Sequence, residues 1–262
     1  MSFSVASAVQ RSNGTWTADL SPDWAVMGNA NGGYLMAIAA RAMAAESGRQ
    51  PVTLTAHFLS PGTAGPVTVS VDTIKTGRAF TTMRAELASG DRLVAILTGS
   101  FGDLRSLAGP VRVDAQPPAL PPPEDCVRVE PAAAGLPPPL TAHVDLRLHP
   151  EDASFGEGRP SGRPLFRGWL RPLPADELDE FMLLLAVDVF PPTVFNAAMP
   201  VAWTPTLELT AHLRAVPSGG WLRCQFSTRF ITGGLLEEDG ELWDDEGRLV
   251  AQSRQLALIP RG

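Results

Sequence analysis

The sequence repeats itself at a nearly fixed distance, and this duplication restricts the possible folds more than any other feature. Three short matches recur in the same order: LTAH at 54–57 and 209–212, TG at 76–77 and 232–233, and RLVA at 92–95 and 248–251. The offsets are 155, 156 and 156 residues. Self-similarity at a constant offset is typical of a chain built from copies of one structural unit. We therefore predict two copies of the same fold.

A proline-rich stretch separates the two copies. Residues 116–140 contain nine prolines, and proline breaks helices and lacks the amide donor that a sheet interior needs. This composition predicts an extended linker. We expect an N-terminal domain at 1–110, a linker at 111–140 and a C-terminal domain at 141–262.

Both copies show one apolar helix followed by a series of strands. Apolar residues at helical spacing predict a helix at 32–43, and a second apolar run at 176–190 ends at Pro191. Alternating or β-branched segments between turn residues predict strands at 52–59, 67–75, 81–88, 93–101, 207–213, 221–231, 235–244 and 249–259. Shorter strands are expected at 16–20, 144–148 and 168–171. A helix followed by an antiparallel meander predicts an α+β fold in which the sheet wraps around the helix.

Charge and cysteine content exclude several classes of protein. The formal net charge is −7, whereas nucleic-acid-binding domains are usually basic. Two cysteines, Cys126 and Cys224, cannot form a disulfide framework or a structural zinc site, and they favour a reducing compartment. Residues 1–10 lack the pattern of a signal peptide, and no apolar run approaches the ~18 residues of a membrane helix. We expect a cytoplasmic protein without nucleic-acid or membrane partners.

Several segments resemble the type II acyl-CoA thioesterase family, whose members carry two hotdog domains in one chain. They are NANGGYL at 29–35, TAHFLSPG at 55–62, KTGRAFTTMR at 75–84 and DDEGRLVAQSRQ at 244–255. The resemblance implies a tandem hotdog fold, in which each domain has an antiparallel sheet wrapped around a central helix. It also implies hydrolysis of a fatty or related acyl-CoA thioester to free acid and CoA, with no cofactor and no metal.

The same resemblance implies three catalytic residues. The family uses an Asp on the second central helix, a Thr or Ser on the next strand and a Gln on the last strand, and these fall on Asp188, Thr206 and Gln255. Thioester hydrolysis needs an activated water and donors for the oxyanion, and such side chains are suited to the task. The sequence departs from the family pattern at Leu256, where the family has Glu. Thr204 remains an alternative for the Thr role.

Two further features are candidate substrate contacts. Asn31, Gly32 and Gly33 begin the first helix, where free backbone amides form an anion or oxyanion site; a tight turn that permits close packing is the alternative. Arg78, near a predicted turn, is a candidate for a CoA phosphate, or an ordinary exposed arginine.

Two other functions stay open on the same fold. An enoyl-CoA hydratase needs a His paired with an Asp, but none of the four histidines (His57, His143, His149 and His212) lies in such a motif. His57 and His212 occupy equivalent repeat positions, which favours a structural role. A non-catalytic acyl-CoA binder would keep the fold without turnover. Exposed sheet edges also leave a homodimer or larger homo-oligomer open.

Overall fold

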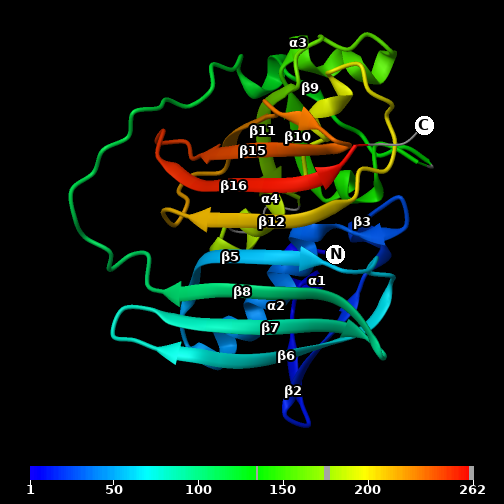
Figure 1. The fold of residues 1–262 in the computed structure, drawn as a ribbon. Coiled ribbons are helices and arrows are strands. Elements are labelled where there is room, and N and C mark those ends of the chain that lie inside the picture. Colours follow the sequence, from blue (N-terminus) through cyan, green and yellow to red (C-terminus); the bar gives the residue numbers. More distant parts are fainter. Residues whose placement is uncertain (134, 174–177, 260–262) are drawn as a thin grey trace.

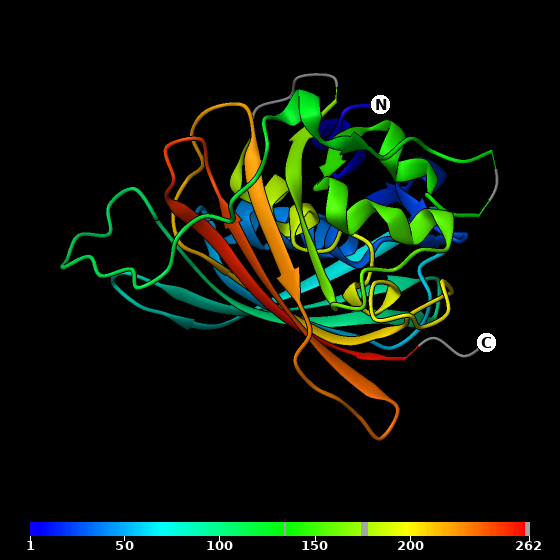
Figure 2. The same ribbon diagram turned by 90° about the horizontal axis from the view of Figure 1, so that it is seen from above.

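A computed structural model describes residues 1–133, 135–173 and 178–259, and these form one curved antiparallel sheet with helices on its inner face (Figures 1 and 2). The described residues contribute 14 strands to this sheet. The strand order is β1-β2-β6-β7-β8-β5-β12-β16-β15-β13-β11-β10-β9, with β14 paired to β15. The two halves of the chain therefore join through β5 and β12, as a tandem α+β arrangement requires.

The strands of the N-terminal half are β1 (Gln10–Ser12), β2 (Thr15–Leu20), β5 (Gln50–Phe58), β6 (Gly65–Thr76), β7 (Thr81–Ser89) and β8 (Arg92–Gly102). Those of the C-terminal half are β9 (Val127–Arg128), β10 (Val144–Leu148), β11 (Leu165–Pro172), β12 (Thr206–Leu213), β13 (Leu222–Ser227), β14 (Ile231–Thr232), β15 (Leu235–Trp243) and β16 (Leu249–Leu258). A separate small ribbon pairs β3 (Ala25–Val26) with β4 (Asn29–Ala30). The predicted strands are confirmed, except that the strand expected at 221–231 divides into β13 and β14. Between the two, the Thr228 hydroxyl donates a hydrogen bond to Glu237 O.

The α-helices are α1 (Phe3–Ala6), α2 (Gly32–Ser47), α3 (Pro150–Ala153) and α4 (Glu180–Ala186). Short 3₁₀ helices are η1 (Pro22–Trp24), η2 (Pro123–Asp125), η3 (Pro139–Ala142), η4 (Ser154–Glu157) and η5 (Thr193–Phe195). Among the described residues, we find no helix with both the length and the apolar character that crossing a membrane requires.

A pseudo-two-fold axis relates the two copies of the sequence repeat in the structure. Where β5 pairs with β12, Thr55 lies opposite Thr210, its own counterpart 155 residues later, and their hydroxyl oxygens are 2.8 Å apart. One step away on either side, Leu54 lies opposite Ala211 and Ala56 opposite Leu209. This reciprocal pairing is the geometry of an isologous interface. The two halves associate within the chain as two identical subunits would.

The central helices α2 and α4 pack against each other inside the curved sheet (Figure 2). α2 begins at Asn31, whose Oδ1 accepts a hydrogen bond from Tyr34 N (2.9 Å), and ends at Gly48 in the left-handed conformation (φ 67°). α4 begins at Asp179, whose Oδ1 accepts from Met182 N (2.7 Å). Each helix therefore begins at a side-chain cap of the preferred type.

The prediction of a helix over 176–190 was too long at its C-terminal end. α4 ends at Ala186, and Asp188 N donates to Leu185 O in a tight turn (2.9 Å). Pro191 and Pro192 follow, and a residue that precedes proline disfavours helical backbone. The predicted first residues, 176 and 177, lie outside the described residues. Asp188 consequently sits in a turn after the helix rather than on it.

The proline-rich stretch is only partly an extended connection. Residues 103–122 contain no helix or strand, and they run around the outside of the sheet from the end of β8 (Figure 1). Residues 123–140 contain η2, β9 and the beginning of η3, and β9 extends the sheet beside β10. The second part of the expected linker therefore packs with the C-terminal half.

Candidate active site

A cavity of about 380 Å³ opens between the two helix ends, β12, β15, β16 and the segment around η3. Most of its lining is apolar, including Phe58, Leu140, Phe190, Phe195 and Phe226. Its polar and charged lining residues include Asn31, Asp188, Thr206, Glu238 and Gln255. An apolar cavity with a few converging polar groups is the usual form of a small-molecule site.

The N-terminus of α2 holds the carboxylate of Asp188. Asp188 Oδ2 accepts hydrogen bonds from Gly33 N (2.9 Å) and from Asn31 Nδ2 (2.9 Å), and Asn31 Nδ2 also donates to Asp188 O (2.7 Å). Free amides and the helix dipole favour a negative charge at this end of a helix. The anion-binding site predicted at residues 31–33 is therefore occupied by the Asp188 carboxylate. Gly33 N is not free to bind a substrate.

Burial raises the pKa of Asp188 to about 6, although the hydrogen bonds from Gly33, Gly32 and Asn31 act in the opposite direction. Removing water disfavours the charged form of a carboxyl group, and donors restore part of that loss. An acid with this pKa is largely ionised at neutral pH and accepts a proton more readily than an exposed Asp. This property suits a general base.

Thr206 and Gln255 form the second part of the site. Thr206 Oγ1 donates to Gln255 Oε1 (2.9 Å), and Gln255 Nε2 donates to Glu238 Oε1 (2.8 Å). Both predicted residues line the cavity with Asp188. Thr204 also lines the cavity, but its hydroxyl donates to Ala202 O (3.1 Å), which leaves Thr206 as the threonine bonded to Gln255.

Glu238 was not among the predicted residues, although the strand pattern contains a signal for it. Along β15, Leu236, Glu238, Gly240 and Leu242 alternate on the buried face. Strict alternation therefore directs one acidic side chain inward among apolar residues. Burial raises its pKa to about 7, with smaller contributions that include the charge of Asp188.

The structure does not bring Arg78 to this cavity. Arg78 is exposed between β6 and β7, where its carbonyl oxygen accepts from Arg49 Nη2 (3.2 Å). Asn31 and Gly32 do line the cavity. His57 and His212 are exposed on β5 and β12, and among the described lining residues there is no histidine.

The pseudo-two-fold axis relates this cavity to a position in the N-terminal half that lacks the same chemistry. The register of the paired strands gives the counterparts of Thr206, Gln255 and Glu238 as Pro51, Gly99 and Met83. A side chain at Gly99 would lie 2.5 Å from Thr53 O. The constellation therefore occurs once rather than twice in the described chain.

Close packing between the helices requires Gly33, and we expect Gly33→Ala to destabilise the protein by about 2–3 kcal/mol. An added Cβ would lie 2.4 Å from Leu184 O and 2.9 Å from Leu185 Cα, both backbone atoms of α4. Chemical denaturation measures the free energy of unfolding. Gly109→Ala is the control, because nothing lies within 4 Å of its added Cβ. Equal stability of the two variants would contradict the close approach.

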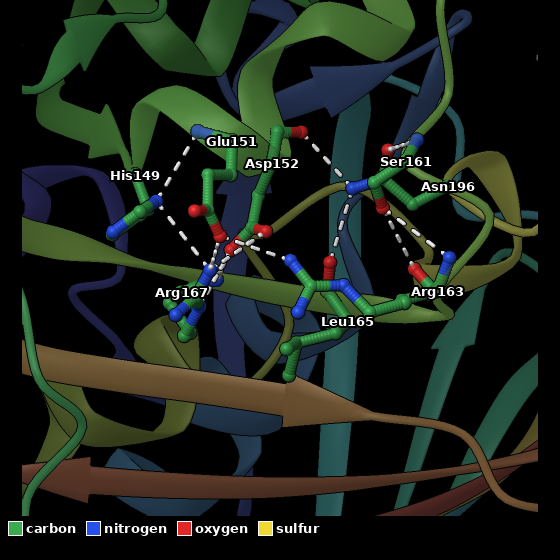
Figure 3. A network of polar contacts seen from close by, with 8 residues as sticks. All are labelled: His149, Glu151, Asp152, Ser161, Arg163, Leu165, Arg167 and Asn196. Atoms are coloured by element: carbon green, nitrogen blue, oxygen red, sulfur yellow. Dashed lines mark hydrogen bonds and ion pairs between the residues drawn. The ribbon is translucent and has the colours of Figure 1, made fainter.

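A second polar cluster, drawn in Figure 3, lies on the C-terminal half. Ligand atoms of His149, Glu151 and Asp152 lie within 4.8 Å of one another. The Arg167 guanidinium already bonds this group, with Nε 2.9 Å from Asp152 Oδ2 and Nη2 3.1 Å from Glu151 Oε2. Asn196 Nδ2 donates to Asp152 O (3.0 Å) and ties the cluster to η5. Since an arginine supplies the positive charge, we interpret the cluster as structural support.

This cluster supports one wall of the cavity. Phe155, two residues beyond α3, and Phe195 of η5 both line the cavity, and their ring centroids are 6.0 Å apart. Asp152 and Asn196 anchor the backbone next to these rings. The hydrogen bonds in Figure 3 thus position the aromatic wall.

Comparisons with known proteins agree with this architecture. The family model of the acyl-CoA thioesterase N-terminal domain matches residues 20–102, and that of the C-terminal domain matches residues 123–259. An uncharacterized protein of Mycobacterium tuberculosis is 31% identical, over 92% of this chain and 90% of its own length. A thioesterase-like protein, TwmA, of Talaromyces wortmannii is 24% identical over 96% of this chain and 90% of its own length.

Solved structures show the same fold over the whole chain. A candidate thioesterase II of Thermobifida fusca superposes with a TM-score of 0.89 at 34% identity, covering 100% of this chain and 98% of that one. A protein of unknown function with a hotdog fold from Alicyclobacillus acidocaldarius gives 0.88 at 23% identity, covering 99% and 98%. The predicted tandem hotdog fold is confirmed. With both domain models matched in order, the chain belongs to the acyl-CoA thioesterase family that joins an N-terminal and a C-terminal hotdog domain.

Proposed function

We propose that this protein is a thioesterase that hydrolyses acyl-CoA to a free acid and CoA, with Asp188 as the general base. Membership of the thioesterase family gives the reaction class. The observation that carries the proposal is one apolar cavity lined by a carboxyl group with a pKa of about 6 and by the hydrogen-bonded pair Thr206–Gln255. A base near its working pKa and polar groups that orient water are what thioester hydrolysis needs.

The proposed reaction uses the chain's own residues in each step. Asp188 takes one proton from a water molecule, while Thr206 and Gln255 orient that water. The water oxygen attacks the thioester carbon, and the C–S bond breaks. Asp188 then returns the proton to the departing thiolate. The products are a carboxylic acid and a thiol, so that one water is consumed for each thioester.

The character of the cavity supports an acyl group as its occupant. Aromatic and aliphatic side chains dominate the lining, and its charged residues, as described, are the acids Asp188 and Glu238. Neither Lys nor Arg is among the described lining residues. The phosphates of CoA therefore belong outside the cavity, with the acyl chain within it.

A hydratase receives less support from the cavity. A hotdog hydratase would need a histidine beside an acid, and the described lining contains no histidine. A non-catalytic acyl-CoA binder uses the same apolar lining, but it has no need for an ionisable group with a raised pKa. Buried ionisable groups are costly and concentrate at functional sites.

The test of the proposed function is a panel of acyl-CoA substrates of graded chain length, including aromatic acyl groups, monitored by release of free thiol. We expect turnover of at least one substrate by the wild-type protein. Binding of acyl-CoA without release of thiol anywhere in the panel would select the binder. Addition of water to an enoyl-CoA double bond without cleavage of the thioester would select the hydratase.

We expect kcat/KM to rise with pH and to reach half of its plateau near pH 6. Asp188 must be ionised to accept a proton, and its pKa is raised to about 6. An exposed Asp, with a pKa of ~3.9, would give no such rise above pH 5. The measurement is initial thiol release between pH 5 and 8 with one stable substrate. A flat profile over this range would exclude Asp188 as the base.

A further inference from the structure

A buried acid lies directly behind the proposed catalytic pair. Glu238 on β15 is 4% exposed, and β15 pairs with β16 so that Glu238 lies opposite Gln255. Glutamate is rarely buried unless its oxygens have partners. The partners of Glu238 therefore indicate what this side chain does.

Both carboxyl oxygens of Glu238 accept hydrogen bonds. Oε2 accepts from Thr193 N (2.7 Å), and Oε1 accepts from Gln255 Nε2 (2.8 Å). A backbone amide can only donate, so the oxygen that faces Thr193 must be an acceptor. The NH₂ group of an amide also only donates, so the oxygen 2.8 Å from Gln255 Nε2 accepts as well. The NH₂ end of the Gln255 amide is thereby held toward Glu238.

This orientation determines how Thr206 faces the cavity. With its NH₂ end on Glu238, Gln255 turns Oε1 toward Thr206, and the Thr206 hydroxyl donates its only proton to that oxygen (2.9 Å). Thr206 Oγ1 then has only lone pairs for the cavity. A water that donates one proton to Asp188 and the other to Thr206 keeps its own lone pair free for attack. If these hydrogen bonds ran in the reverse direction, the Thr206 hydroxyl would point its proton at that lone pair.

We propose that Glu238 is a positioning residue: it fixes the direction of the Gln255–Thr206 hydrogen bond, so that Thr206 accepts a proton from the attacking water. The inference rests on the proposed function, in which these two residues orient that water. Glu238 acts through Gln255 and does not itself exchange a proton with the substrate.

The pseudo-symmetric position supports this role. The cross-strand pair Glu238–Gln255 corresponds to Met83–Gly99 in the N-terminal half. Met83 is fully buried at the same place in its own sheet. The fold therefore accepts an apolar side chain at this position where no polar pair needs to be oriented. A glutamate at this position is therefore present in the half that holds Thr206 and Gln255, and the hotdog fold itself does not require it.

The test is the isosteric variant Glu238→Gln. The new amide must present its oxygen to Thr193 N, which leaves its NH₂ group facing Gln255. Gln255 must then rotate and present its own NH₂ group to Thr206. We expect kcat to fall at least tenfold while KM changes less than about twofold, because Gln has nearly the volume of Glu and the cavity keeps its shape. The thermal midpoint should stay within a few degrees, since the volume is kept and a buried charge is removed.

A swapped double variant distinguishes hydrogen-bond direction from mere structure. In Glu238→Gln combined with Gln255→Glu, the amide at 238 donates to the carboxylate at 255, which again accepts from Thr206. We expect at least a fivefold recovery of kcat over Glu238→Gln. Glu241→Gln is the matched control on the same strand, because Glu241 alternates to the outer face. A wild-type kcat for Glu238→Gln, or no recovery in the double variant, would overturn the proposal.

The amide direction can also be read without turnover. The side-chain ¹H–¹⁵N signals of Gln255, identified by their loss in Gln255→Glu, should shift strongly in Glu238→Gln and remain in place in Glu241→Gln. Unchanged signals in Glu238→Gln would overturn the positioning role. If wild-type protein releases no thiol but these signals do shift, the proposed function fails while the hydrogen-bond assignment holds.

Discussion

Replacing Asp188 with Asn is expected to lower kcat/KM for thioester hydrolysis by about 10²–10⁴-fold, the usual contribution of a general base. An Asn at this position keeps an oxygen for the amide of Gly33 and the side chain of Asn31, so that the turn after α4 is retained. What it loses is the ability to accept a proton. Thiol release from the best substrate of the panel measures the effect, and Asp72→Asn on exposed β6 is the control. Activity of Asp188→Asn within tenfold of wild type would refute the role of Asp188.

The same variant should be more stable than wild type at pH 8, by about 1 to 3 kcal/mol. The pKa of Asp188 is raised from 3.8 to about 6 in the folded protein, so that folding disfavours its ionised form. Asp188 therefore contributes a fall in stability as pH rises from about 4 to above 6, and the variant should lack this contribution while both proteins keep the one from Glu238. Chemical denaturation at pH 4 and pH 8 compares the two proteins. A stability difference that does not change with pH would contradict the raised pKa.

The largest expected loss of stability is that of Asp152→Ala, about 3 to 5 kcal/mol. Asp152 is completely buried and accepts hydrogen bonds from Arg167 N (3.1 Å), Nε (2.9 Å) and Nη2 (3.1 Å). Its removal leaves a buried backbone amide and part of a guanidinium without an acceptor. The free energy of unfolding from urea titration measures the loss.

The neighbouring acid gives a matched control for this cluster. Glu151 also accepts a hydrogen bond from Arg167, but its side chain is 61% exposed, and an exposed ion pair contributes little to stability. Glu151→Ala should therefore leave the unfolding free energy almost unchanged. Comparable losses in the two variants would show that burial does not decide the strength of these contacts.

Local patterns in the sequence were sufficient for most of the elements. The alternation in 81–88 and 249–259 and the helical spacing in 32–43 predict β7, β16 and α2 within a few residues. The end of α4 was placed too late: the helix ends at Ala186, and the turn at 187–188 brings Asp188 to the N-terminus of α2. That contact joins residues 155 positions apart, and helical spacing contains no information about it.

The candidate site was predictable only in part. The resemblance identifies Asp188, Thr206 and Gln255, and the structure brings all three to one cavity. Arg78, the candidate for a CoA phosphate, is exposed in a turn and is not among the described lining residues, so its role stays a prediction. Glu238 was missed, although its inward position follows from alternation along β15, because its partner Gln255 lies on the next strand and is identified only by the register.

The sequence by itself determined that the chain contains two copies of one α+β unit, because repeats, turn residues and hydrophobic periodicity are local properties. Tertiary structure decided the rest of the site. The pairing of β5 with β12 arranges the copies around a pseudo-two-fold axis. Packing of α2 against α4 places the Asp188 carboxylate at the N-terminus of α2. Strand register then assembles Thr206, Gln255 and Glu238 in one half, whereas the pseudo-symmetric positions of the other half hold Pro51, Gly99 and Met83. Contacts between residues far apart in the chain depend on register and packing, and no local pattern encodes either.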